Sequence, residues 1–358
     1  MTMDQLMNWL PFSVDWPAAA FFTAALMCGT IIFIFIAVYA LMAIYGEVKI
    51  SSFMQDKVGP MGQGVGFHAG KWGLLQPVAD ALKLILKEDI ISGLADKILF
   101  IMAPYVVFVG AFISFAALPV NQHTVVADLN IGVFYILAVG SLSVIGIILA
   151  GWSSNNKWSL YGGMRSVAQI VSYEIPAGLS IITVIMLTET LSMQGIVEFQ
   201  QGTIWGILPN WIIFNNPFTF IAFFIFFISG VAECNRTPFD IPEAESELVA
   251  GAFTEYSGMR YAFFFLSEYA EMFVISAVAS TVFLGGWNSP ITGFFEGPFW
   301  GLFWFMGKSL FLVFVMMWFR WTFPRLRVDQ LMSICWKVFL PFSLVNIFGV
   351  AIWSLIVG

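Results

Sequence analysis

Residues 18–46 read AAAFFTAALMCGTIIFIFIAVYALMAIYG, an unbroken stretch without Asp, Glu, Lys or Arg. A helix that spans the hydrocarbon core of a bilayer needs about 20 mostly apolar residues. Because this stretch is longer, it predicts a membrane-spanning helix that is tilted or that extends into an interface. The apolar residues follow one another without alternating with polar ones, so a helix is expected and a barrel strand is not.

The composition of the whole chain points the same way. Of its 358 residues, 59% are hydrophobic and only 10% are charged, whereas soluble domains carry roughly 45–50% apolar and about 25% charged residues. So few charges could not cover the surface of a soluble protein, which excludes soluble enzymes, nucleic-acid binders and disordered chains. The 3 cysteines and 2 histidines provide neither a disulfide framework nor a metal site.

The same length criterion finds seven further apolar stretches along the chain. They predict an all-α polytopic membrane protein, with residues 1–358 forming a single integral membrane domain. Residues 1–16 contain no Lys or Arg, so a cleavable signal peptide is not expected before the first span. The eight expected spans are 18–46, 98–120, 130–151, 168–188, 212–232, 259–285, 298–319 and 335–357.

The basic residues test this span count independently. Fourteen of the 15 lie in or beside the first, third, fifth and seventh loops, and the remaining one, Lys308, lies inside the seventh span. Cytoplasmic loops carry an excess of Lys and Arg. The odd-numbered loops are therefore predicted to be cytoplasmic, and both termini to lie outside.

The first loop, residues 47–97, contains an expected amphipathic helix over residues 78–89. Val78, Leu82 and Ile85 lie on one side, and Asp80 and Lys83 on the other. Two interpretations remain open. The helix could lie on the membrane surface with its charges in water, or it could form the wall of a cavity with Asp80 and Lys83 turned inward.

The fifth loop, residues 233–260, holds an unusual concentration of acids. Asp240 and Glu243 fit the start of a helix, with Asp240 as the N-cap and Pro242 in the first turn. The other acids are either a solvated face or a buried cluster that carries protons. The six acids are Glu233, Asp240, Glu243, Glu245, Glu247 and Glu255.

Acids also occur inside the expected spans. Glu174 lies in the fourth span, and Glu268 and Glu271 lie three residues apart in the sixth. A charge at mid-membrane costs about 2.5–3.5 kcal/mol even on the lenient insertion scale. These side chains therefore face the interior of the bundle, where they either fix helix packing as buried pairs or form a path for protons or ions.

Several long motifs resemble a known family. They include AECNRTPFDIPEAESELVAG at 232–251, TEYSGMRYAFFFLSEYAEM at 254–272 and RWTFPRLRVDQLMSICWKVFLP at 320–341. Two shorter stretches are LLQPVADALKLILKEDI at 74–90 and AQIVSYEIP at 168–176. From about residue 40 to its end, the chain resembles the H subunits of bacterial NADH-quinone oxidoreductases, the family that includes subunit 1 of mitochondrial respiratory complex I. The resemblance departs at 55–66, where two arginines of the family pattern are absent.

The resemblance implies a proton-translocating membrane subunit without a redox centre of its own, in a bacterial plasma membrane. Its substrate would be a quinone, such as ubiquinone or menaquinone, with FMN and iron–sulfur clusters in partner subunits of the peripheral arm. Small membrane-arm subunits would be further partners. The residues implied at the quinone chamber are Glu47, Asp80, Lys83, Arg236, Asp240, Glu243, Glu245, Glu247 and Glu255. Those implied on the proton path are Glu174, Glu233, Glu268 and, with lower weight, Glu271.

Two other functions remain compatible with the residues. One is a membrane subunit of a related membrane-bound hydrogenase, and the other is a stand-alone ion-coupled transporter. Co-purification separates the three functions. A peripheral arm with flavin and iron–sulfur clusters supports the oxidoreductase, nickel–iron subunits support the hydrogenase, and a lone chain supports the transporter.

Overall fold

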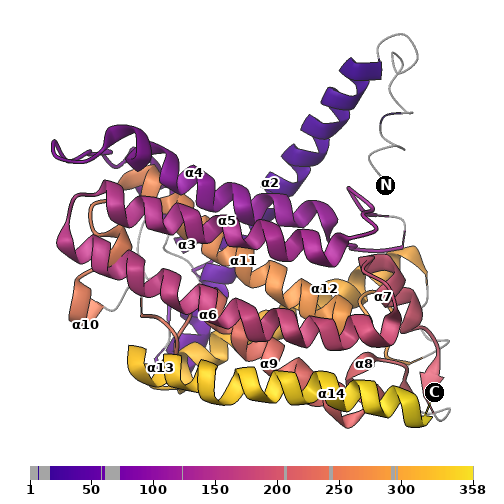
Figure 1. Ribbon diagram of the computed structural model, residues 1–358. Coiled ribbons are helices and arrows are strands. Elements are labelled where there is room, and N and C mark those ends of the chain that lie inside the picture. The colour runs from indigo at the N-terminus through magenta and orange to yellow at the C-terminus, as the bar shows by residue number, and fades with distance from the viewer. Residues whose placement is uncertain are drawn as a thin grey trace.

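The computed structural model describes residues 7, 17–57, 59–60, 73–122, 124–204, 208–241, 245–291, 295 and 297–357. Long helices lie side by side in one bundle, joined by short helices and loops at its two ends (Figure 1). The elements are α2 (Pro17–Met54), α3 (Gln76–Leu86), α4 (Lys97–Ser114), η1 (Phe115–Ala117), α5 (Gly132–Ser153), α6 (Lys157–Thr188), α7 (Met193–Phe199), β1 (Thr203–Ile204), β2 (Leu208–Pro209), α8 (Ile212–Asn215), α9 (Pro217–Glu233), α10 (Glu245–Leu248), η2 (Gly251–Phe253), α11 (Gly258–Phe283), α12 (Pro298–Thr322), α13 (Val328–Ile334), η3 (Cys335–Phe339) and α14 (Leu340–Val357).

Among the described residues, seven helical segments are long and apolar enough to cross a membrane, which confirms the all-α polytopic class. The fifth expected span is broken into α8 and the 17-residue helix α9. The break falls at Asn216, whose side chain accepts a hydrogen bond from the backbone of Thr219, while the Thr219 hydroxyl accepts one from the backbone of Asn216. This reciprocal cap starts a new helix, with Pro217 in its first turn.

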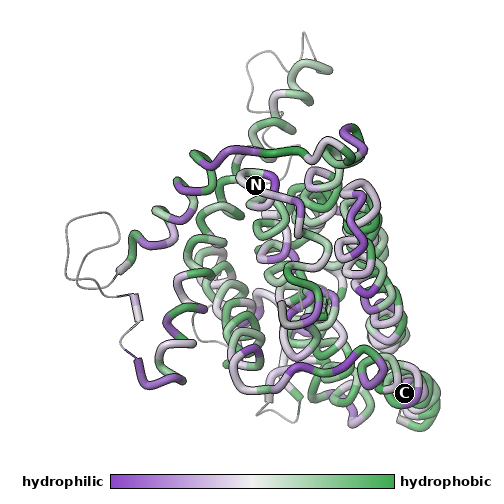
Figure 2. The backbone as a smooth tube through the Cα atoms, turned by 90° about the vertical axis from the view of Figure 1, so that its left-hand side faces the viewer, coloured by the Kyte–Doolittle hydropathy of each residue, from purple (hydrophilic) through white to green (hydrophobic). Residues whose placement is uncertain are grey.

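Basic residues lie at one end of the bundle, where Lys97 begins α4, Lys157 begins α6 and Arg320 lies in the last turn of α12. We call the end that carries α10 and α13 the basic end, on the left in Figure 1, and the end that carries α7 and α8 the opposite end. Figure 2 shows the bundle from the basic end, with hydrophobic segments (green) predominating in the helices and hydrophilic residues (purple) among them. The long helix α2 crosses the other helices obliquely, as expected for the tilted first span (Figure 1).

Two helices extend farther at the basic end than their apolar stretches predict. Helix α2 continues to Met54, so Glu47 lies on the helix and not in a loop. Helix α6 begins at Lys157, where the side chain of Asn156 accepts a hydrogen bond from the backbone of Trp158. Hydropathy locates the part of a helix inside the membrane, whereas caps and breakers locate its ends.

A π-helical turn, η3, interrupts the last span between α13 and α14. The Tyr173 side chain, fully buried on α6, donates a hydrogen bond to the carbonyl of Leu331 (3.1 Å). The carbonyl of the preceding residue, Ser172, accepts a hydrogen bond from the Cys335 thiol (3.0 Å). Helix α6 therefore fixes the last span at the point where its regular hydrogen bonding changes.

Close backbone contact between α6 and η2 depends on Gly162. A Cβ atom at this position would lie 2.5 Å from the backbone nitrogen of Ala252 and 2.7 Å from the backbone carbon of Gly251. Backbone atoms cannot move aside as a flexible side chain can. Glycine is therefore required here for packing and not for a special turn.

Replacing Gly162 by Ala is expected to destabilise the protein by about 1–3 kcal/mol, the usual cost of overpacking. The measurement is the thermal unfolding midpoint of the purified protein. Gly178 lies on the same helix, and a Cβ there would meet nothing within 4 Å. Gly178→Ala is therefore the matched control and should leave the midpoint unchanged or raise it slightly, because alanine favours a helix. Equal shifts for both variants would contradict this account of Gly162.

Candidate functional site

A buried arginine lies where the loop after α9 meets two long helices. Arg236 is only 5% exposed. Its guanidinium is 3.7 Å from a carboxylate oxygen of Glu47 on α2 and 3.8 Å from one of Glu268 on α11. The guanidinium carbon also lies 4.4 Å from the centre of the Tyr269 ring, which makes a cation–π contact.

Glu47 connects this arginine to a second one. The Tyr269 hydroxyl donates a hydrogen bond to Glu47 Oε2 (2.6 Å), and Arg320 of α12 forms an ion pair with Glu47 Oε1. Glu47 is itself buried. Charge-assisted hydrogen bonds of this kind offset the cost of removing a carboxylate from water. We call Glu47, Arg236, Glu268, Tyr269 and Arg320 the arginine cluster.

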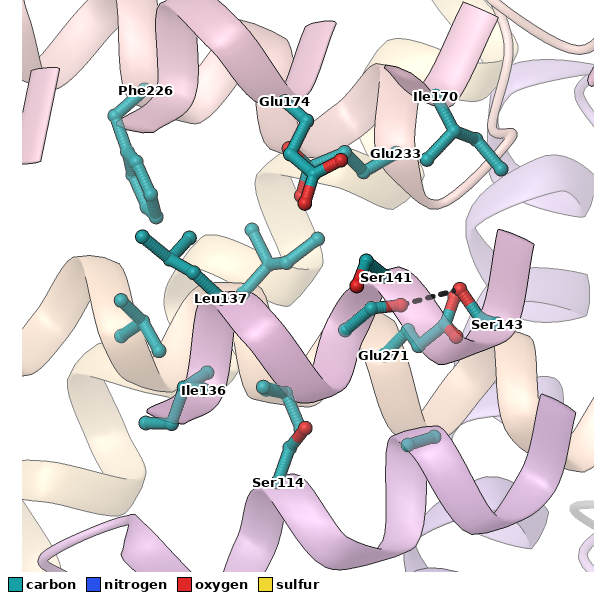
Figure 3. Close-up of a pocket in the computed structure, with 15 residues that line it drawn as sticks. Ser114, Ile136, Leu137, Ser141, Ser143, Ile170, Glu174, Phe226, Glu233 and Glu271 are labelled. Carbon is teal, nitrogen blue, oxygen red and sulfur yellow. Dashed lines mark hydrogen bonds between the residues drawn. The ribbon is translucent and has the colours of Figure 1, made fainter. Parts of the chain in front are cut away.

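A second group of side chains lies beside the arginine cluster, inside the bundle. The carboxyl groups of Glu174 on α6, Glu233 on α9 and Glu271 on α11 line one cavity of ≈ 70 Å³, enough for more than one water molecule (Figure 3). Glu271 is hydrogen-bonded with the hydroxyl of Ser143 on α5. We call Glu174, Glu233 and Glu271, with the space between them, the carboxylate cavity.

The carboxylate cavity differs from the arginine cluster in its charge balance. Among the described residues that line it there is no Lys, Arg or His. Glu233 and Glu271 each have one buried carboxyl oxygen without a hydrogen-bond partner in the described part of the chain. Glu233 lies within electrostatic range of both other acids. Three carboxylates could not remain charged together here at low cost, so the cavity suits the holding of protons.

Two short segments join the two sites. Glu233 lines the cavity and Arg236 is the centre of the arginine cluster, three residues later in the same turn region. On α11, Glu268 contacts Arg236, whereas Glu271, one helical turn later, lines the cavity. The sequence predicts that Glu268 and Glu271 share a helix face, but the two carboxyls have different neighbours. A change in one site can therefore reach the other through a single turn of backbone.

Cys234 lies between these two sites and has no charge to contribute. Burial raises the pKa of the Cys234 thiol well above its ordinary value. The thiol is therefore neutral at physiological pH. The cation on the other side of Cys234 in the sequence is the Arg236 guanidinium, which contacts Glu268.

The remaining acids of the fifth loop are spread among separate partners. Asp240 pairs with Arg325 at 2.9 Å, and Glu247 pairs with Arg165 at 2.7 Å. Glu255 accepts a hydrogen bond from Asn156 (2.7 Å). These contacts connect the loop to α6 and to the segment between α12 and α13.

The predicted helix start at Asp240 is only partly covered by the structure. Glu243 lies outside the described residues, and α10 begins at Glu245, of which only the backbone is described. Asp240 is buried, and its Oδ2 accepts from Arg325.

The amphipathic helix of the first loop is observed as α3, which begins at Gln76 with Pro77 in its first turn. Asp80 and Lys83 form an ion pair across one helical turn at 3.7 Å, with side chains 47% and 72% exposed. An ion pair so exposed contributes only about 0–1 kcal/mol to stability. The place of these two residues at a quinone chamber stays a prediction.

Sequence reasoning missed three residues of these sites. Arg320 and Tyr269 bind Glu47, and Ser143 binds Glu271. Tyr269 stands next to Glu268, and Arg320 begins the RWTFPRLR motif, so both were within the recognised stretches. A serine in an apolar helix gives no signal of its own, since most such hydroxyls bond to their own helix backbone.

Comparisons with known proteins agree with the motifs. A family model described as NADH dehydrogenase matches residues 27–351. The chain is 54% identical to the H subunit of NADH-quinone oxidoreductase from Chlorobaculum tepidum, over 96% of this chain and 94% of that protein. It is 46% identical to the protein of the same name from Bacteroides fragilis, over 92% and 90% of the two chains. The matched range includes every residue of the arginine cluster and the carboxylate cavity.

Replacing Arg236 by Met would leave Glu47 and Glu268 without the cation between them. Breaking a buried ion pair from one side costs about 3–5 kcal/mol. Lys83→Met is the control because both side chains of the Lys83–Asp80 pair are exposed (72% and 47%), and exposed pairs contribute only about 0–1 kcal/mol. The readout is the thermal unfolding midpoint. Adding Glu268→Gln to Arg236→Met should recover part of the loss, and strictly additive effects would contradict the contact.

Proposed function

We propose that this chain, which belongs to the NADH dehydrogenase family, couples quinone reduction to proton translocation as a membrane subunit of the oxidoreductase. Its relatives are named as the H subunit of NADH-quinone oxidoreductase. The arginine cluster borders the quinone chamber, and the carboxylate cavity begins the proton path. The chain links the peripheral arm, which supplies electrons, to the rest of the membrane arm.

In this proposal, the arginine cluster responds to the change of charge that quinone reduction produces. Reduction of a quinone takes up electrons and protons, so it changes the charge near its headgroup. Arg236 and Arg320 share Glu47, so Glu47 keeps one cationic partner if a change in a neighbouring charge moves the other arginine. Because the charges are buried, they are screened much less than surface charges.

The carboxylate cavity supplies the part that carries protons. It contains three half-buried acids without a base among its described lining residues, and it has room for water. Neutral carboxyl groups in such a place can release and take up protons when the local potential changes. Intramembrane acids of this kind form proton relays in pumps and transporters.

The observation that carries the proposal is the placement of both sites on the same two segments. Arg236 and Glu233 are three residues apart, as are Glu268 and Glu271. Movement of Arg236 toward or away from Glu268 changes the potential at Glu233 and Glu271. Electron transfer in a partner subunit can therefore alter proton affinity in this chain without any redox centre here.

The partners and location follow from the same proposal. FMN and iron–sulfur clusters belong to the peripheral-arm subunits, which dock on the basic end, and small membrane-arm subunits receive the protons. The membrane is the bacterial plasma membrane, with the basic end in the cytoplasm and both termini outside. Asp80, Lys83, Asp240, Glu243, Glu245, Glu247 and Glu255 border the chamber or the docking surface.

Glu271→Gln keeps the shape of the side chain but cannot release a proton. In the assembled complex we expect coupled quinone reduction and proton pumping to fall by roughly 10²-fold, the low end of what a positioned proton carrier contributes. Glu268→Gln should also reduce both activities. Electron transfer from NADH to an artificial acceptor should stay intact in both variants.

The control is Glu198→Gln, which neutralises an exposed acid on α7 at the opposite end. It should leave pumping unchanged. If Glu271→Gln assembled normally and retained both quinone reduction and pumping, the carboxylate cavity would be a packing feature and the proposal would fail.

A further inference from the structure

Lys308 is the one basic residue that stands apart from the basic loops, in the middle of α12. Its ammonium group donates three hydrogen bonds, to the carbonyls of Leu284 (2.7 Å), Gly286 (3.0 Å) and Asn288 (2.7 Å). An ammonium has three donors, so all of them are used.

Leu284 is the C-cap residue of α11, where the last carbonyls of a helix have no partner within the helix, and Gly286 and Asn288 lie in the turn that follows. The end of a helix also carries partial negative charge, which favours a cation there. The Lys308 ammonium also lies 4.3 Å from the centre of the Trp211 ring, immediately before α8. Lysine and tryptophan thus occupy the place where water would otherwise solvate the helix end.

Gln200 holds the same stretch of α11 from another side. Its side chain is 1% exposed. The amide donates to the carbonyl of Thr281 (2.9 Å), and its oxygen accepts from the backbone of Gly285 (2.9 Å) and Ile212 (3.2 Å). Together, Lys308 and Gln200 satisfy backbone groups from Thr281 to Asn288. We call this pair the latch.

The latch separates two hollows of different character. On one side the carboxylate cavity extends along α11 to Val278 and is bordered by Phe226. On the other side, at the opposite end, a polar hollow of ≈ 410 Å³ is lined by Asn121, Trp287 and Asn288, and by Gln200 itself.

The segment between the two hollows is apolar as well as fixed. Phe283 is fully buried. Its ring lies 5.7 Å from that of Phe226, which borders the carboxylate cavity, and 5.6 Å from that of Phe223. A proton moving from the polar hollow toward Glu271 would have to pass this aromatic layer and a fixed cation. Pores exclude protons with the same combination of a constriction and a positive charge.

We propose that the latch is an electrostatic seal, in which the Lys308 cation and the buried end of α11 keep the carboxylate cavity from exchanging protons with the aqueous phase at the opposite end. This inference rests on the proposed function in one respect, since a seal matters only if the cavity carries protons. The seal confines the three acids to proton exchange with the basic end and with neighbouring membrane subunits.

The test measures passive proton leak in proteoliposomes that contain the assembled complex, without NADH or quinone. An imposed potassium diffusion potential drives protons, and a trapped pH-sensitive dye reports them. Lys308→Met should raise the leak several-fold and lower the number of protons pumped per electron in a subsequent assay with NADH. Lys308→Arg, which keeps the charge, should leak less than Lys308→Met.

Ser309→Ala is the matched control. Ser309 is buried next to Lys308, and its hydroxyl has no hydrogen-bond partner among the described residues, so its loss should change neither leak nor pumping. If Lys308→Met fails to assemble, Gln200→Leu tests the other half of the latch and should also leak.

A leak equal to that of the unmodified complex in every assembled latch variant would overturn the seal. So would equal leak in the Met and Arg variants, because the cation would then have no part in it. Failure of the proposed function would appear elsewhere, as retained pumping in Glu271→Gln. The leak assay contains no substrate, so the two failures are distinguishable.

Discussion

The guanidinium of Arg236, buried between Glu47 of α2 and Glu268 of α11, is the contact on which the arrangement of this protein depends. In an apolar interior a charge must be paired, hydrogen-bonded or neutralised. Here two arginines, two carboxylates and a tyrosine satisfy one another and bring together α2, α11, α12 and the loop after α9. None of these elements could shift far without exposing a buried charge.

The same constraint explains the contrast with the carboxylate cavity one helical turn away. There the acids have no base beside them among the described lining residues, so neutral carboxyl groups have a lower free energy than charged ones. Helix α11 serves both sites and the latch: Glu268 and Tyr269 enter the arginine cluster, Glu271 lines the cavity, and the carbonyl of its C-cap residue Leu284 binds Lys308. A small displacement of this helix changes three environments together, which is the property that coupling over a distance requires.

Much of the fold could be predicted from hydropathy and charge, because bilayer thickness limits span length and because basic residues gather on one side. The break at Asn216 could not, since it results from a local cap within an apolar stretch. The intramembrane acids were identifiable in the sequence because placing each charge inside a membrane costs free energy. The partners of buried acids could not be identified in this way: Arg320, for example, lies 273 positions from Glu47 in the sequence, and no local pattern connects them. The separation of Glu268 from Glu271 likewise depends on which neighbouring helix each side chain meets.

The central claim is that a change of charge beside the arginine cluster alters protonation in the carboxylate cavity. Infrared difference spectroscopy of the assembled complex, recorded as the quinone is reduced, measures this directly through the carbonyl stretch of protonated carboxyl groups. The account predicts a carboxyl band that changes on quinone reduction, disappears in Glu271→Gln and persists in Glu198→Gln. A difference spectrum without any carboxyl band, or one unchanged by Glu271→Gln, would contradict it.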